Sequence, residues 1–183
     1  MKIPFAGFEI TFQDDPELES IGLSLFCCGC KKNCLFCQNP ELQNPKNCPL
    51  VDLNYILEEI KNRLNLIDSI IFLGGDFAYY PRQLYYLAKK CKELNLKNIL
   101  YTGFTFNYIK KFKYINYLDL IIDGKFLINY HIPGFFPASI NQKIWKKINN
   151  EFVEVNPLNL PINQNISDDL IKKYFQLKGE LKC

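Results

Sequence analysis

Residues 26–40 of the chain read F-C-C-G-C-K-K-N-C-L-F-C-Q-N-P and contain five of its eight cysteines. Within this stretch Cys30, Cys34 and Cys37 follow a C-x3-C-x2-C spacing. Three thiolates on one short loop can hold three irons of a cubane cluster and leave the fourth iron without a protein ligand. An open coordination position makes a metal site reactive, whereas structural sites are closed. The spacing therefore favours a reactive 4Fe-4S site on this loop.

Two other metal sites compete with this interpretation. Zinc would use the two C-x2-C pairs that start at Cys27 and Cys34, but three residues separate these pairs, against about 12 or more in zinc fingers and ribbons. A bacterial ferredoxin run needs C-x2-C-x2-C and a distant fourth cysteine, which this loop does not provide. A second cluster built from Cys27, Cys28, Cys48 and a tail cysteine also stays open.

We expect the remaining cysteines to pack as structural residues or assign them no role. Cys91 falls on the apolar stripe of a predicted helix, where a free cysteine packs as a small hydrophobic residue. Cys27 and Cys28 end a predicted strand, and we expect them to pack beneath the loop. Cys48 and Cys183 receive no role from the sequence.

Residues 1–9 lack the continuous apolar segment and small-residue cleavage site of a signal peptide. No apolar stretch approaches the roughly 18 residues of a membrane-spanning helix. We therefore expect a cytoplasmic protein without a membrane partner, where clustered cysteines bind metal or act in catalysis. The 22 basic and 19 acidic residues are scattered and include only two arginines, so nothing indicates nucleic acid as a partner.

Away from the cysteines, short apolar runs alternate with segments whose apolar residues have helical spacing. This alternation is typical of βα units and a parallel sheet, and 48 % hydrophobic residues in 183 supply the core. We predict strands over residues 21–26, 67–73, 97–101, 118–122 and 152–155, and helices over 53–65, from Pro81 onward, and over 106–112, 141–148 and 168–177.

Glycine and polar motifs follow these predicted strands. They are Gly74-Gly75-Asp76, Thr102-Gly103 and Asp123-Gly124-Lys125. In parallel α/β folds ligands bind at the carboxyl ends of the strands, so we expect the three motifs and the cysteine loop to converge on one rim. Glycines there let the backbone approach a ligand closely.

With these motifs the chain resembles the radical S-adenosylmethionine (SAM) superfamily. More narrowly, it resembles the activating proteins of anaerobic (class III) ribonucleoside-triphosphate reductases. That family shares the Gly-Cys at the first ligand, the Gly-Gly-Asp, and strings matched here by Y-T-G-F at 101–104, D-G-K-F at 123–126 and A-S-I-N-Q at 138–142. The chain departs from it at 14–20, where D-D-P-E-L-E-S replaces a Gly-Pro-Gly.

The resemblance implies an incomplete (β/α) barrel of the radical SAM type, with parallel strands and outer helices. It implies one domain over 1–183, with a core of about 8–148 and a C-terminal strand and helical tail over 149–183. A 4Fe-4S cluster on Cys30, Cys34 and Cys37 and SAM are the implied cofactors. The residues expected to bind SAM are Phe36 at the adenine, Gly74, Gly75 and Asp76 at the methionine end, and Thr102, Gly103, Asp123 and Lys125 along the rim.

The implied activity is activation of a glycyl radical enzyme. One electron from a reduced donor such as flavodoxin would cleave SAM to methionine and a 5′-deoxyadenosyl radical, which abstracts hydrogen from a glycine of the large reductase subunit. The alternatives are an activase of another glycyl radical enzyme, a small radical enzyme acting on a metabolite, and a non-catalytic metal-binding module. Six lysines would ordinarily form a solvated face, although an acidic electron donor could dock there: Lys110, Lys111 and Lys113, with Lys143, Lys146 and Lys147.

Overall fold

The computed structural model describes residues 1–181 and contains one sheet of eight strands in the order β3-β1-β2-β4-β5-β6-β7-β8. The strands are β1 (Lys2–Thr11), β2 (Gly22–Cys27), β3 (Leu50–Asp52), β4 (Ser69–Gly74), β5 (Lys97–Thr102), β6 (Leu120–Asp123), β7 (Lys143–Ile148) and β8 (Glu151–Val155). The α-helices are α1 (Leu53–Lys61), α2 (Pro81–Glu93), α3 (Phe106–Ile109) and α4 (Asp168–Glu180). The sheet is open, since β3 and β8 form its two edges.

The centre of the sheet is parallel and its flanks are antiparallel. Strands β2, β4, β5 and β6 run in one direction, as the alternating pattern predicts. β1 pairs antiparallel with β2 and β3, while β7 pairs antiparallel with β6 and β8. The α/β class is confirmed, but the expectation of parallel strands throughout is wrong for these four flanking strands.

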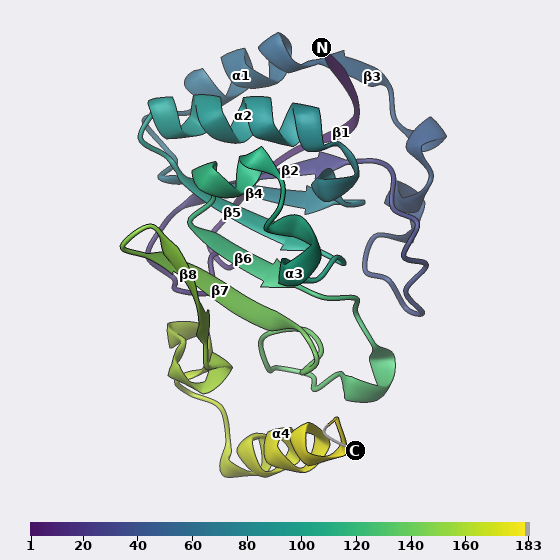
Figure 1. Ribbon diagram of the computed structural model, residues 1–183, viewed down its shortest axis with the longest axis vertical. Helices are drawn as coiled ribbons and strands as arrows, with labels where there is room; N and C mark the ends of the chain where they lie inside the picture. The colour runs from purple at the N-terminus through teal and green to yellow at the C-terminus, as the bar shows by residue number, and fades with distance from the viewer. Residues whose placement is uncertain (182–183) are drawn as a thin grey trace.

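Two helices cover one face of the sheet. α1 and α2 lie side by side there (Figure 1), and their buried side chains pack with alternating residues of β2 and β4. Asp52 caps α1, as predicted, because its carboxylate accepts from the backbone N–H of Asn54 at 2.9 Å. The apolar stripe of α2 that ends at Cys91 is fully buried, which confirms its prediction.

The opposite face carries a smaller core. Ile71, Ile99 and Ile122 project from β4, β5 and β6 and pack with Leu160 and Phe136 from the C-terminal part of the chain. α4 packs against residues 130–140 through Tyr174, and it lies at the far end of the molecule from the N-terminus (Figure 1). Loops rather than helices therefore cover this face.

Sequence reasoning went wrong in two places along the chain. The helix predicted over 141–148 is strand β7, which joins β8 through Asn149 and Asn150, both with positive φ (50° and 68°). Two asparagines in the left-handed region form the tight turn that a two-residue hairpin requires. β1 and β3 were not predicted at all. None of the helices among residues 1–181 is long and apolar enough to cross a membrane.

Candidate functional site

The cysteine loop, residues 28–49, begins where β2 ends. Backbone hydrogen bonds fix its course: Gly29 N–H donates to the carbonyl of Leu42 at 2.7 Å, and Cys30 N–H donates to that of Gln43 at 2.9 Å. Gly29 has φ +113°, and a Cβ there would lie 2.2 Å from the hydroxyl oxygen of Tyr80. Glycine is therefore required directly before the first predicted ligand.

Cys30, Cys34 and Cys37 are free thiols, partly exposed, and all three line one cavity. Burial, with the nearby charge of Asp76, raises the pKa of Cys30 to about 11, and burial also raises the pKa of Cys34. Without a metal these two side chains are neutral thiols at pH 7. A coordinating metal ion removes the proton of a thiol outright.

Cys30, Cys34 and Cys37 offer three sulfur atoms, the donor type that iron–sulfur clusters take. Within residues 1–181, no three His, Cys, Asp or Glu side chains converge on one metal-ion position. In a cubane each cysteine thiolate binds a different iron, so the sulfurs surround the cluster. Three free cysteines that line one cavity provide donors of this type, and their binding of a cluster stays a prediction.

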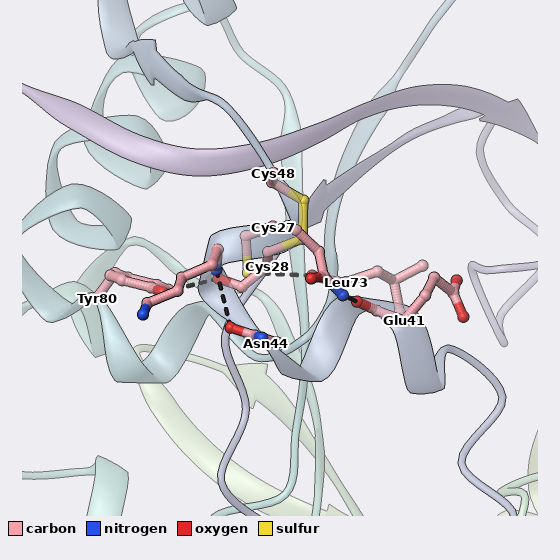
Figure 2. The surroundings of a disulfide bond; sticks show 9 residues. Cys27, Cys28, Glu41, Asn44, Cys48, Leu73 and Tyr80 are labelled. Carbon is pink, nitrogen blue, oxygen red and sulfur yellow. Dashed lines mark hydrogen bonds between the residues drawn. A yellow bond between two sulfur atoms is a disulfide. The ribbon is translucent and has the colours of Figure 1, made fainter.

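Cys28 and Cys48 form a disulfide that encloses the three free cysteines in one loop (Figure 2). Their Cα atoms are 5.9 Å apart. The Tyr80 hydroxyl donates to the carbonyl of Cys28 at 2.7 Å and ties this end of the loop to the start of α2. Cys27 is fully buried, and its thiol lies 3.7 Å from the carbonyl of Leu73.

Burial of Cys27 and Cys28 beneath the loop is thus confirmed, whereas the disulfide was missed. The sequence argument assigned clustered cysteines to metal, and nothing in the spacing marks Cys48 as a partner 20 residues away. Since Cys28 and Cys48 bond to each other, they do not form the second cluster considered above. Its other candidate, Cys183, lies outside the described residues.

The Gly74-Gly75 pair packs against the cysteine loop. Gly74 has φ +91°, and a Cβ there would lie 2.5 Å from the backbone N and O of Cys27. A Cβ on Gly75 would lie 2.8 Å from the backbone N of Gly29. Both glycines also line the cavity. Their lack of side chains therefore serves the fit between β4 and the cysteine loop as well as access to a ligand.

Asp76 lies just beneath the cavity wall and is almost fully buried. Its Oδ2 accepts from the hydroxyl of Thr102 and from the N–H of Gly103, both at 2.9 Å, and its Oδ1 accepts from Ala78 N–H at 2.9 Å. Burial raises the pKa of Asp76 to about 6, although these donors favour the charged form. The carboxylate thus joins the ends of β4 and β5, and the two motifs predicted to meet do meet.

The third motif is split by the structure. Asp123 is buried and accepts from the backbone N–H groups of Phe106 and Lys143. Burial raises its pKa despite these donors. Lys125 is exposed and lines a smaller neighbouring pocket together with Leu35 and Phe126. Neither Asp123 nor Lys125 lines the main cavity, although Gly124 between them does.

Phe36 lies on the outer side of the cysteine loop. It has φ +57° and its side chain is 71 % exposed, and it does not line the cavity. A positive φ is uncommon for a residue other than glycine. Contact of Phe36 with an adenine stays a prediction.

The main cavity has a volume of about 650 Å³, within the usual range of small-molecule sites. Seven of its lining residues belong to the predicted set, which brings the cysteine loop and two of the motifs together: Cys30, Cys34, Cys37, Gly74, Gly75, Thr102 and Gly103. Other lining residues were not among the predicted site residues, including Glu9, Asp14, Tyr101, His131 and Phe136. These residues come from β1, β5 and loops far apart in the chain, and of the five only Tyr101 belongs to a motif quoted above, Y-T-G-F at 101–104.

Comparison with known proteins gives three matches. A protein-family profile described as "4Fe-4S single cluster domain" matches residues 19–145. The chain is 30 % identical over 128 residues to the anaerobic ribonucleoside-triphosphate reductase-activating protein of Enterobacteria phage T4, which covers 66 % of this chain and 81 % of the phage protein. It is 32 % identical over 75 residues to a putative glycyl-radical enzyme activating enzyme of Haemophilus influenzae, covering 40 % of this chain and 29 % of that protein.

Proposed function

The chain belongs to the 4Fe-4S single cluster domain family and is a radical SAM activase of glycyl radical enzymes, and on that premise we propose that its target is a glycine of an anaerobic ribonucleoside-triphosphate reductase. The large subunit of that reductase is then its partner, and a reduced protein such as flavodoxin is its electron donor. The open sheet is the partial barrel of a radical SAM domain that spans the whole chain. The phage T4 relative supports the choice of target.

The observation that carries the proposal is that three free thiols and the Gly74-Gly75 pair line the same cavity. We assign Cys30, Cys34 and Cys37 as ligands of the 4Fe-4S cluster. When bound, the cluster supplies one electron that cleaves SAM into methionine and a 5′-deoxyadenosyl radical.

The chain positions this reaction and shields it. Gly74 and Gly75 present bare backbone to the methionine end of SAM, while Asp76 holds Thr102 and Gly103 beside it. The apolar residues of the cavity exclude water from part of the volume. We place Phe36 at the adenine and Asp123 and Lys125 at the rim. Because Phe36 is exposed, its contact with the adenine requires the cysteine loop to fold over bound SAM.

The Asp76 carboxylate gives a first test of this assignment. Asp76→Ala removes the acceptor that holds the Thr102 hydroxyl and the Gly103 N–H beside the cavity, and losing such charge-assisted hydrogen bonds costs about 1.5–3 kcal/mol. We expect the displaced Thr102 and Gly103 to weaken SAM binding about tenfold or more. Calorimetric titration of SAM into the reconstituted protein measures this. Thr102→Val removes one donor to Asp76 with less disturbance of the core and should weaken binding in the same direction.

Asp169→Ala is a suitable control, because this carboxylate is 92 % exposed on α4. Iron content should stay at the wild-type level in all three variants. Unchanged SAM affinity in a folded, iron-loaded Asp76→Ala protein would remove Asp76 from the site.

The identity of the target is tested by the radical itself. The main cavity is partly open to solvent, and a glycine-bearing loop of a large partner would cover it. Reduced protein and SAM, mixed anaerobically with the large reductase subunit, should produce the doublet electron paramagnetic resonance signal of a glycyl radical. A signal on another glycyl radical enzyme, with none on the reductase, would assign the chain to that enzyme instead.

A further inference from the structure

Beside the cysteine loop lies a surface patch formed by Lys32, Phe104, Tyr108, Lys110, Lys111 and Phe112, which we name the lysine–aromatic patch. Residues 27–40 and 102–118, the two segments that supply it, contain five lysines and no Asp or Glu. Among the described residues, no carboxylate lies within ion-pair distance of any of these lysines. The lysines of the patch therefore form no ion pair within residues 1–181, although the charge of Lys32 acts on the buried carboxyl of Asp76 and opposes the rise in its pKa that burial causes.

Aromatic rings hold lysine side chains of the patch in place. The rings of Phe104 and Tyr108 stack with centroids 4.8 Å apart and planes inclined by 14°, and Phe112 follows 5.7 Å beyond Tyr108. Lys32 Nζ lies 3.8 Å from the centroid of Phe104, and Lys111 Nζ lies 4.1 Å from that of Tyr108. Cation–π contacts of this kind hold ammonium groups over the rings. Tyr108 is also 42 % exposed, so part of this row faces solvent.

The patch is continuous with the wall that carries the first predicted cluster ligand. Cys30, Lys32 and Gly103 line the same cavity. A Cβ on Gly103 would lie 2.8 Å from Cγ of Lys32, so the cysteine loop and the turn after β5 are in close contact. A partner seated on Phe104 and Lys32 would thus lie beside the cysteine loop.

Resting on the proposed function, we propose that the lysine–aromatic patch docks an acidic one-electron carrier protein. Positive charge on one partner and negative charge on the other steer association and orient the encounter. Exposed aromatic rings provide the apolar contact that interfaces favour at their centre. The reduced carrier would give up one electron, becoming oxidised, to a cluster that Cys30, Cys34 and Cys37 would hold.

The test compares Lys110→Glu/Lys111→Glu with a matched control, Lys172→Glu/Lys173→Glu on α4. Both double variants change the net charge by the same amount, and all four lysines are exposed. SAM cleavage is followed as 5′-deoxyadenosine at low ionic strength, driven by subsaturating reduced flavodoxin of acidic composition or by dithionite. Binding of oxidised flavodoxin to each reconstituted protein is measured separately by calorimetry.

We expect the patch variant to lose about tenfold or more of the flavodoxin-driven rate and to bind flavodoxin correspondingly more weakly. Its rate with dithionite should equal that of wild type, because this small reductant needs no docking surface. The control should keep both rates. The difference in flavodoxin-driven rate between wild type and the patch variant should shrink in about 1 M salt. At this ionic strength exposed charges more than about 3 Å apart are largely screened.

Equal flavodoxin affinity in wild type and the patch variant would overturn the proposal. So would an equal loss in both double variants, which would show an effect of net charge, or a loss with dithionite, which would show damage to the site. A patch variant that failed only to radicalise the large subunit would assign the patch to that partner instead. If wild type formed no 5′-deoxyadenosine with dithionite, the proposed function would fail, while the calorimetry would still decide the docking surface.

Discussion

Replacement of Cys30, Cys34 or Cys37 by Ala is expected to abolish the visible absorbance of the reconstituted iron–sulfur cluster. Each thiolate would bind a different iron, so the loss of one leaves two ligands and a second iron without a protein donor. Iron and sulfide bound per chain should fall to background after desalting. Without the cluster, SAM cleavage should also be lost.

The other cysteines supply the controls for this experiment. Cys91→Ala alters a fully buried thiol in α2, far along the chain from the loop, and should retain the cluster. Cys27→Ala and Cys48→Ala should retain it as well, although Cys48→Ala removes the disulfide that encloses the loop. An equal loss of absorbance in Cys27→Ala or Cys48→Ala would show that the ligand assignment is wrong.

Lys97→Met should lower the free energy of unfolding by roughly 3 kcal/mol, near the lower end of the range for breaking a buried ion pair. Lys97 Nζ lies 2.8 Å from Asp15 Oδ2 and 2.8 Å from Glu17 Oε2. The Asp15 side chain is fully buried and that of Lys97 is 21 % exposed, so the variant leaves a buried carboxylate without its cation. Urea unfolding at pH 7 measures the change.

Lys143→Met is the matched control. Lys143 also lies 2.8 Å from a carboxylate, that of Glu154, but both side chains are nearly half exposed, and such surface pairs contribute about 1 kcal/mol or less. If Lys97→Met lowered the free energy of unfolding as little as Lys143→Met, the ion pairs of Lys97 with Asp15 and Glu17 would have no structural role.

The same network predicts a pH dependence. Burial acts to raise the pKa of Glu17, but hydrogen bonds from Lys146 and Lys97 hold it below its ordinary value of 4.5. A carboxylate with a lowered pKa in the folded state stabilises the protein above its unfolded-state pKa, and this contribution is lost as the pH falls through the folded-state value. The stability difference between wild type and Lys97→Met should therefore shrink below a pH of about 4.5.

This network also supports the cavity. Residues 14–20 replace the Gly-Pro-Gly of the related family, and Asp15 and Glu17 bind them to the amino end of β5 through Lys97. Their neighbour Asp14 lines the cavity and is held by Ser24 at 2.6 Å and, through its carbonyl, by Tyr101 at 2.8 Å. Loss of the Lys97 ion pairs should therefore make the position of Asp14 in the cavity less fixed.

The sequence by itself determined the elements whose signals are local. The apolar spacing and Pro81 fixed α2, and Asp52 fixed the start of α1. The parallel strands β4 and β5 were predictable because buried strands of a parallel sheet are continuous apolar runs. The C-x3-C-x2-C spacing likewise sufficed to indicate the family, since three ligands on one short loop need no distant residue to be recognised.

Tertiary structure alone decided the elements that depend on distant partners. Ile144 and Ile148 have helical spacing, yet residues 143–148 form a strand because β6 and β8 offer hydrogen bonds on both sides. β1 contains Pro4 and Gly7, which argue against a strand locally, but it is held between β2 and β3. Local propensity is weak, and pairing across the sheet overrides it.

The tertiary structure also decided which loop residues reach the cavity and which cysteines form the disulfide. His131 and Phe136 reach the cavity from a loop that the C-terminal segment supports, and Cys48 meets Cys28 only because the cysteine loop turns back on itself. Asp76 shows what the local sequence and the tertiary structure each contribute. Its place at a strand end was predictable, but its bonds to Thr102 and Gly103 required two strands 26 residues apart to lie side by side.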